Sequence, residues 1–282
     1  MLAIHSPFRY PGGKYYARSK ILKLIPETYI SYIEPFAGGA SIFFAKQKST
    51  PTLLNDKDPE LINCYIQIRD NVECLIELLN QVKESPSKEL HTYYKNSYIH
   101  KNKQEQAFRW FLLNRISYSG IMKPSNCYWG YGDQYSMRPE RWPDLLRKCS
   151  EKLQGVELTC QDFETVINQA REGAFLFIDP PYWGGGQRRF YNPSFDKADH
   201  LRLLEILKRK SKDIAFLLTY DDALELKKYY QGWDCLPMIS INEVSWNYTL
   251  NRTDDQLNGT NKRGKRSHGR ELFIYNYVPP SL

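Results

Sequence analysis

The stretch FLFIDPPYW, residues Phe175–Trp183, decides how the chain is interpreted. Its first four residues, Phe175–Ile178, are apolar and predict a short buried strand that brings Asp179 to the edge of a sheet. Two prolines follow and restrict the backbone, so that the Pro180 carbonyl cannot turn inward to a helical partner. Asp179 and Pro180 thus present two hydrogen-bond acceptors beside the ring of Tyr182. The exocyclic amine of a nucleobase, with its two N–H donors, would satisfy both; the alternative is a helix start with Asp179 as its N-cap.

Similar apolar runs occur on both sides of this stretch, bounded by Gly, Pro or Asp, and predict further buried strands. Helical spacing of apolar residues predicts helices between them, within Pro59–Val82 and Lys197–Lys212. Strands that alternate with helices are typical of an α/β fold with a doubly wound sheet. The other predicted strands are Tyr29–Ile33, Thr52–Leu54, Val156–Thr159, Ile214–Thr219 and Leu272–Tyr277.

Two segments depart from this alternation. Residues 84–147 are polar, basic and rich in Tyr and Trp, with one helical pattern at Gln104–Arg115, and they predict an inserted subdomain. Residues Asn251–Arg270, which include KRGKRSHGR, predict a basic loop before the last strand.

Composition limits the possible classes of protein. The 282 residues have a net charge of +7, and 21 Tyr, 13 Phe and 6 Trp supply flat rings, as expected of a protein that binds a polyanion such as nucleic acid. No apolar run approaches the roughly 20 residues of a membrane helix, and no signal peptide is apparent. The six cysteines have neither zinc-ligand nor disulfide-framework spacing, which favours a reducing, cytoplasmic location and no metal site.

Two further motifs lie where the predicted strands end. The glycine turn EPFAGGAS, Glu34–Ser41, follows the first strand and lets the backbone approach a ligand closely. It lacks the spacing of a phosphate loop, which counts against an NTPase. In NDKD, Asp56 follows the next strand and is placed to accept hydrogen bonds from a ribose, while Asp58 is placed to cap the helix that begins at Pro59.

Five motifs in this order resemble those of Dam-like DNA adenine methyltransferases. They are YPGGK (Tyr10–Lys14), EPFAGGAS, ND (Asn55–Asp56), LNR (Leu113–Arg115) and DPPY (Asp179–Tyr182). The resemblance implies a Rossmann-like, S-adenosylmethionine-dependent methyltransferase core, residues 1–83 and 148–282. It also implies that residues 84–147 are a mainly helical target-recognition subdomain that binds DNA.

The resemblance also implies site residues. Those that would bind S-adenosylmethionine are Tyr10, Lys14, Phe36, Ala37, Gly38, Asp56, Asp162, Phe163 and Asp179. The catalytic motif would be Asp179, Pro180 and Tyr182, which would hold a flipped-out adenine of double-stranded DNA for direct methyl transfer to N6, with no metal.

Candidate DNA contacts come from the chemistry of the side chains. They are Arg115, Tyr118, Lys123, Asn126 and Arg138 in the insert, and Lys265 and Arg266 in the basic segment. Arg188 and Arg189 are either a cover over the flipped base or a solvated pair. After LNR the sequence departs from the family pattern, so the family's GATC specificity is not carried over.

Two alternatives remain open at this point. One is N4-cytosine methylation, which uses the same pair of acceptors, although Asp179 favours adenine. The other is a DNA-binding module with a decayed active site, against which the intact Lys14, Asp56 and DPPY stand. A monomer is expected, and a restriction endonuclease acting on the same site is a possible partner.

Overall fold

The computed structural model describes residues 4–48, 51–82, 85–132, 134, 136–182, 195–221, 228–230, 240–247 and 268–280, with the backbone alone at 221, 240–247 and 268–270. Within these ranges, no helix is both long and apolar enough to cross a membrane.

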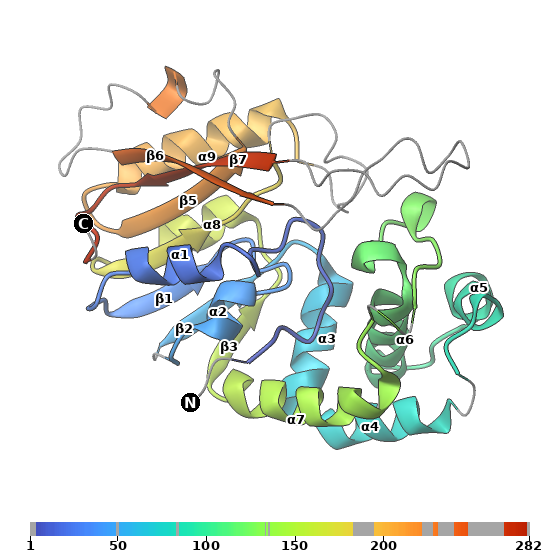
Figure 1. Ribbon diagram of the computed structural model, residues 1–282. Helices are drawn as coiled ribbons and strands as arrows, with labels where there is room; N and C mark the ends of the chain where they lie inside the picture. Colours follow the sequence, from blue (N-terminus) through green and yellow to red (C-terminus); the bar gives the residue numbers. More distant parts are fainter. Residues whose placement is uncertain are drawn as a thin grey trace.

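A seven-stranded sheet forms the centre of the described chain (Figure 1). Its order is β3-β2-β1-β4-β5-β7-β6, in which β1 to β5 are parallel and β7 runs antiparallel to both its neighbours. This arrangement confirms the predicted Rossmann-like, doubly wound α/β fold. The strands are β1 (Ser31–Glu34), β2 (Thr52–Asn55), β3 (Val156–Thr159), β4 (Ala174–Ile178), β5 (Ala215–Asp221), β6 (Ser240–Asn247) and β7 (His268–Tyr275).

The strand order reverses at β1, which lies between β2 and β4. In doubly wound sheets the connections leave such a point in opposite directions, and a crevice opens at the carboxyl ends of the strands. β6 was not predicted, because its sequence SINEVSWN mixes polar and apolar residues without a clear period.

Side chains of β4 divide between two hydrophobic clusters, one on each face of the sheet. Phe175 and Phe177 belong to one cluster, and Ala174, Leu176 and Ile178 to the other. All five are buried, which explains why the strand is continuously apolar. Helices α8 (Phe163–Gln169) and α9 (Lys197–Lys210) pack with the second cluster, whereas α1 (Arg18–Leu24), α2 (Ser41–Ala45), α3 (Pro59–Asp70), α4 (Val72–Gln81), α6 (Lys103–Ile116) and α7 (Trp142–Leu153) contribute to the first.

The helical stretch predicted within Pro59–Val82 is interrupted. Asn71 has φ −138° and ψ 38°, values outside the helical region, and it separates α3 from α4. The sequence gives no Gly or Pro to mark this break, so periodicity alone suggested one continuous helix.

Between β2 and β3 the chain adds helices on the right of Figure 1. They include α5 (Lys88–Asn96), α6 and three short 3₁₀ turns, η1 (Tyr118–Gly120), η2 (Pro124–Asn126) and η3 (Pro139–Arg141). Since α6 packs against α3 and α4 in the same hydrophobic cluster, this part shares the core of the sheet domain. The predicted boundary at residue 147 falls inside α7.

Candidate active site at the carboxyl edge of the sheet

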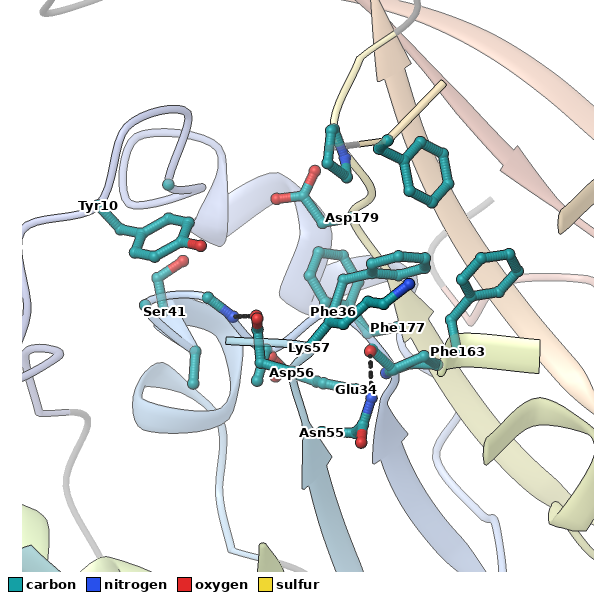
Figure 2. A pocket seen from close by; sticks show the side chains of 18 of the residues that line it. Tyr10, Glu34, Phe36, Ser41, Asn55, Asp56, Lys57, Phe163, Phe177 and Asp179 are labelled. Atoms are coloured by element: carbon teal, nitrogen blue, oxygen red, sulfur yellow. Dashed lines mark hydrogen bonds between the residues drawn. The ribbon is translucent and has the colours of Figure 1, made fainter. Parts of the chain in front are cut away.

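A pocket opens where β1, β2 and β4 end, under the N-terminal segment. It has about 870 Å³ of empty space, its open mouth included, and is lined by residues that include Tyr10, Phe36, Asp56, Phe163 and Asp179. Figure 2 shows Asp56 and Asp179 beside this space, with Tyr10 on one side of it and Phe36 and Phe163 on the other. A pocket of this size accommodates a small organic ligand.

The glycine turn after β1 is shaped by its contact with Tyr10. Gly38 has φ +46°, and a Cβ placed there would lie 2.7 Å from the Cε1 atom of Tyr10. A Cβ on Gly39 would lie 2.9 Å from the Cβ of Tyr10. Both glycines are therefore needed for the N-terminal segment to pack directly on the turn.

Asn55 and Asp56 join the ends of three strands. The Asn55 side chain donates to the carbonyls of Pro35 (2.9 Å) and Gln161 (3.0 Å), and its Oδ1 accepts from the amide of Gln161 (2.8 Å). Asp56 Oδ2 accepts from the amide of Gly38 at 2.9 Å. Burial raises the pKa of Asp56, while hydrogen bonds from backbone amides oppose that shift.

Asp58 caps α3, as predicted. Its Oδ1 accepts from the amides of Glu60 (2.9 Å) and Leu61 (3.2 Å), the arrangement expected of an N-cap before Pro59. Burial and the charge of Asp56 raise the pKa of Asp58 to about 7.

Three aromatic rings line the far side of the pocket. The rings of Phe36 and Phe163 stack with centroids 5.2 Å apart, and Phe195 meets Phe36 edge-on at 5.5 Å. Asp162, next to Phe163, caps α8 and forms an ion pair of 2.6 Å with Arg202. Burial works against ionisation of Asp162, but the hydrogen bonds from Arg202 and the Glu164 amide, with the charges of Arg202 and Lys57, together outweigh it and lower the pKa of this carboxyl.

Lys14, which is buried, and Asp179, which is half-buried, form an ion pair across the edge. Lys14 is 3% exposed, and its Nζ lies 2.6 Å from Asp179 Oδ1 and 3.9 Å from Glu271 Oε2. The hydroxyl of Thr219 also donates to Asp179 Oδ1, at 2.7 Å. Burial lowers the pKa of Lys14, but the two carboxylates more than compensate, so its pKa lies above the usual value.

Pro180 is buried, and Tyr182 is half-buried beside this ion pair. Lys14 Nζ lies 4.8 Å from the centroid of the Tyr182 ring, a cation–π distance. The structure thus brings the residues of YPGGK and DPPY together, although more than 160 positions separate them in the chain.

Comparison with known proteins agrees with this geometry. Residues 10–250 match the D12 class N6 adenine-specific DNA methyltransferase family. The chain belongs to this family. It is therefore an S-adenosylmethionine-dependent methyltransferase that acts on adenine N6 in DNA, and the resemblance predicted from the motifs is confirmed.

Its similarity to individual members is modest. The methyltransferase is 29% identical over 250 residues to a type II methyltransferase of Lactococcus lactis subsp. cremoris, a match that covers 81% of this chain and 85% of the relative. It is 25% identical over 303 residues to a type II methyltransferase of Methanocaldococcus jannaschii, covering 96% and 99% of the two chains. The DNA adenine methylase of Haemophilus influenzae is 24% identical over 245 residues, with 81% and 84% covered.

One expected DNA contact of the methyltransferase lies inside the protein. Arg115 is 6% exposed, its Nη1 donates to the Pro7 carbonyl at 3.5 Å, and burial together with Arg9 lowers its pKa to about 10. The residue sits on α6, nearly all of whose second half is buried. The guanidinium is thus not offered to DNA from the surface, which differs from the role expected of its chemistry.

The other insert residues named from the sequence lie nearer the surface. Tyr118 is 41% exposed, Arg138 is exposed, and Lys123 and Asn126 are half-buried. Lys123 lines a second hollow, whose wall also includes Tyr10. Lys265, Arg266, Arg188 and Arg189 lie outside the described residues.

The hydrogen bonds that hold the N-terminal segment against the insert were not predicted from the sequence. Asn114, fully buried, accepts from the Arg9 amide at 2.9 Å and donates to the carbonyls of Arg9 (2.8 Å) and Gly120 (3.1 Å). A Cβ on Gly120 would lie 2.1 Å from the Arg9 carbonyl oxygen. The LNR motif therefore has a structural role, and the signal for it was a polar residue in the mostly apolar second half of the helix.

Glu34 and Glu271 were also missed as site residues. Glu34 is 1% exposed and accepts from the Tyr32 hydroxyl (2.6 Å) and the Phe43 amide (2.9 Å). Burial raises the pKa of Glu34 to about 8. Glu271 is also 1% exposed. In both cases a carboxyl group in a buried strand was the available signal.

Proposed function

We propose that the pocket binds S-adenosylmethionine, with its adenine near Phe36 and Phe163, its ribose at Asp56 and its methionine end at the turn Phe36–Gly38. Tyr10 and Lys14 complete this site from the N-terminal segment, and Asp162 flanks the adenine. The residues fit such a ligand: apolar rings suit a base, and a carboxylate suits two ribose hydroxyls. The bond from Gly38 to Asp56 supports this assignment, because it ties the acid to the turn.

When bound, S-adenosylmethionine supplies an electrophilic methyl group. Asp179 and the Pro180 carbonyl accept hydrogen bonds from N6 of the target adenine and orient its lone pair toward that methyl group. Tyr182 stacks on the flipped base and recovers about 1–3 kcal/mol of the few kcal/mol that flipping costs. The side chains thus act by positioning and by electrostatic stabilisation.

The ion pair between Lys14 and Asp179 is the observation on which this proposal depends. It holds a carboxylate at the end of β4, and Asp179 lines the pocket. Both donors to Asp179, Lys14 and Thr219, bond Oδ1. Among the described residues Oδ2 accepts no hydrogen bond, which leaves it for a substrate amine.

DNA contacts are assigned to the insert and to the basic segment. Residues 84–147 form the target-recognition part, and the core comprises residues 1–83 and 148–282. Tyr118, Lys123, Asn126 and Arg138, together with Lys265 and Arg266, contact double-stranded DNA. Two relatives are named type II methyltransferases, which supports a restriction endonuclease as a partner acting on the same site. A cytoplasmic monomer that uses no metal suits this chemistry.

Mass spectrometry of nucleosides tests the proposal. Unmethylated double-stranded DNA incubated with the protein and S-adenosylmethionine should yield N6-methyladenine, and Asp179→Ala should yield none while still binding the cofactor in calorimetry. N4-methylcytosine would overturn the base assignment. Cofactor binding without any modified base would overturn the proposal for double-stranded DNA.

A further inference from the structure

Three neighbouring strands contribute to the surroundings of Lys14. Asp179 follows β4, Thr219 lies on β5 and Glu271 lies on β7, and these strands are adjacent in the sheet. Since Ile178 pairs with Leu218, Thr219 is level with Asp179 on the neighbouring strand. The proposed mechanism uses Asp179 but assigns nothing to Thr219.

The hydroxyl of Thr219 has one proton, and geometry indicates where it goes. The oxygen lies 2.7 Å from Asp179 Oδ1 and 3.5 Å from the Ile178 carbonyl oxygen, so the proton is donated to the carboxylate. Thr219 is 0% exposed, so bulk solvent does not compete for this proton. A hydrogen bond to a charged group is stronger and more directional than a neutral one.

Lys14 alone would fix the position of Asp179 less well. Its ammonium has three donors on a long stem, and it also bonds the Gly12 carbonyl at 3.0 Å. Thr219, in contrast, is β-branched and sits in the middle of a strand that is hydrogen-bonded on both sides. The threonine therefore sets the rotation of the carboxylate, and the lysine supplies charge.

We propose that Thr219 is a positioning residue that orients the Asp179 carboxylate, directing Oδ2 at the N6 amine of the target adenine. This inference rests on the proposed role of Asp179. It predicts that loss of the hydroxyl slows the methyl-transfer step and leaves binding of cofactor and DNA intact.

The test compares single-turnover rates of methyl transfer at saturating S-adenosylmethionine and DNA. Thr219→Val should lower this rate roughly tenfold with KM and cofactor Kd within about twofold of the wild type, and Thr219→Ser should restore it to within about threefold. Thr52→Val is the matched control, because Thr52 is also buried but begins β2, at the end of the strand away from the carboxyl edge, and it should retain the wild-type rate. If Thr219→Val does not fold, Thr219→Ser and Thr219→Ala repeat the comparison at smaller volume.

A wild-type rate in Thr219→Val would overturn the inference. So would an equal loss in the Val and Ser variants, because Ser keeps the hydroxyl, and the hydroxyl would then not account for the rate. Failure of the proposed function is a different result: the wild-type protein itself would make no N6-methyladenine, or Asp179→Ala would remain active.

Discussion

The carboxyl edge of the sheet has two sides, and the carboxyl groups on these two sides have different hydrogen-bond partners. On the glycine-turn side, after β1 and β2, Glu34 and Asp56 are held by backbone amides, and burial raises the pKa of each. On the lysine side, at β4 and β7, Asp179 and Glu271 surround the ammonium of Lys14. The first arrangement suits a preformed ligand site. The second places carboxyl groups where, in the proposed mechanism, positive charge develops on the substrate amine.

The largest effect should come from the lysine side. Asp179→Asn keeps the shape of the side chain but removes its charge, so methyl transfer at saturating cofactor and DNA should fall on the order of 10³-fold. The Kd for S-adenosylmethionine should change by less than about threefold. Single-turnover kinetics and calorimetry measure the two quantities. Asp70→Asn, exposed at the C-terminal end of α3, is the control and should keep the wild-type rate. If Asp179→Asn lost as much cofactor affinity as rate, the lysine side would not differ from the glycine-turn side in its effect on catalysis.

Asp56→Asn, on the glycine-turn side, should give the opposite pattern. Its carboxylate accepts from the Gly38 and Asp58 amides, and loss of the charge should weaken S-adenosylmethionine binding roughly 10- to 100-fold. The rate at saturating cofactor should stay within about threefold of the wild type. Titration calorimetry followed by rate measurement checks both; a slower rate with unchanged affinity would contradict the ribose assignment.

The same contrast explains how much the sequence predicted. EPFAGGAS and NDKD are each a short continuous segment that joins one strand to the next helix. Which residues lie near one another in each segment can therefore be predicted from a few consecutive positions. The lysine side is assembled from segments more than 160 positions apart. A single sequence does not reveal that Thr219 meets Asp179 there, or that Glu271 meets Lys14.

Arg115 shows why side-chain chemistry alone does not predict the DNA contacts of the insert. Its chemistry suggested a DNA contact, but the second half of α6 is buried, and Arg115 is buried with it. The fold class was predictable because six apolar runs, several of them separated by helical patterns, indicate it. In contrast, β6 and the break at Asn71 follow from packing that the local sequence pattern does not show.

Two glycines can test whether contact with Tyr10 constrains the glycine turn. Gly38 and Gly155 both have positive φ, but a Cβ on Gly38 meets the Tyr10 ring, whereas a Cβ on Gly155 meets nothing within 4 Å. Replacing either with Ala should cost about 1 kcal/mol for the backbone alone. Gly38→Ala should cost about 1 kcal/mol more, because the ring must move. Chemical denaturation measures both, and equal losses would show that contact with Tyr10 does not constrain the turn.

The effect of Glu34 appears only as a pH dependence of stability. The folded protein holds this proton up to about pH 8, whereas the unfolded chain releases it near the ordinary value of 4.5. Between these values the unfolded state binds fewer protons, so this group makes the protein less stable as pH rises. Glu34→Gln imitates the neutral acid, since its carbonyl oxygen can still accept from Tyr32 and Phe43.

The comparison to make is the difference in unfolding free energy between Glu34→Gln and the wild type. This difference should shift in favour of the variant by on the order of 3 kcal/mol from pH 5 to pH 8, because the other titrating groups are the same in both proteins and cancel. Lys46 and Asp179 are the charged groups that act on Glu34 from outside β1, and neither is altered. Glu77→Gln, exposed on α4, should show no such trend. A constant difference across this range would mean that Glu34 is ionised when folded, and the two sides of the edge would then treat their carboxyl groups alike.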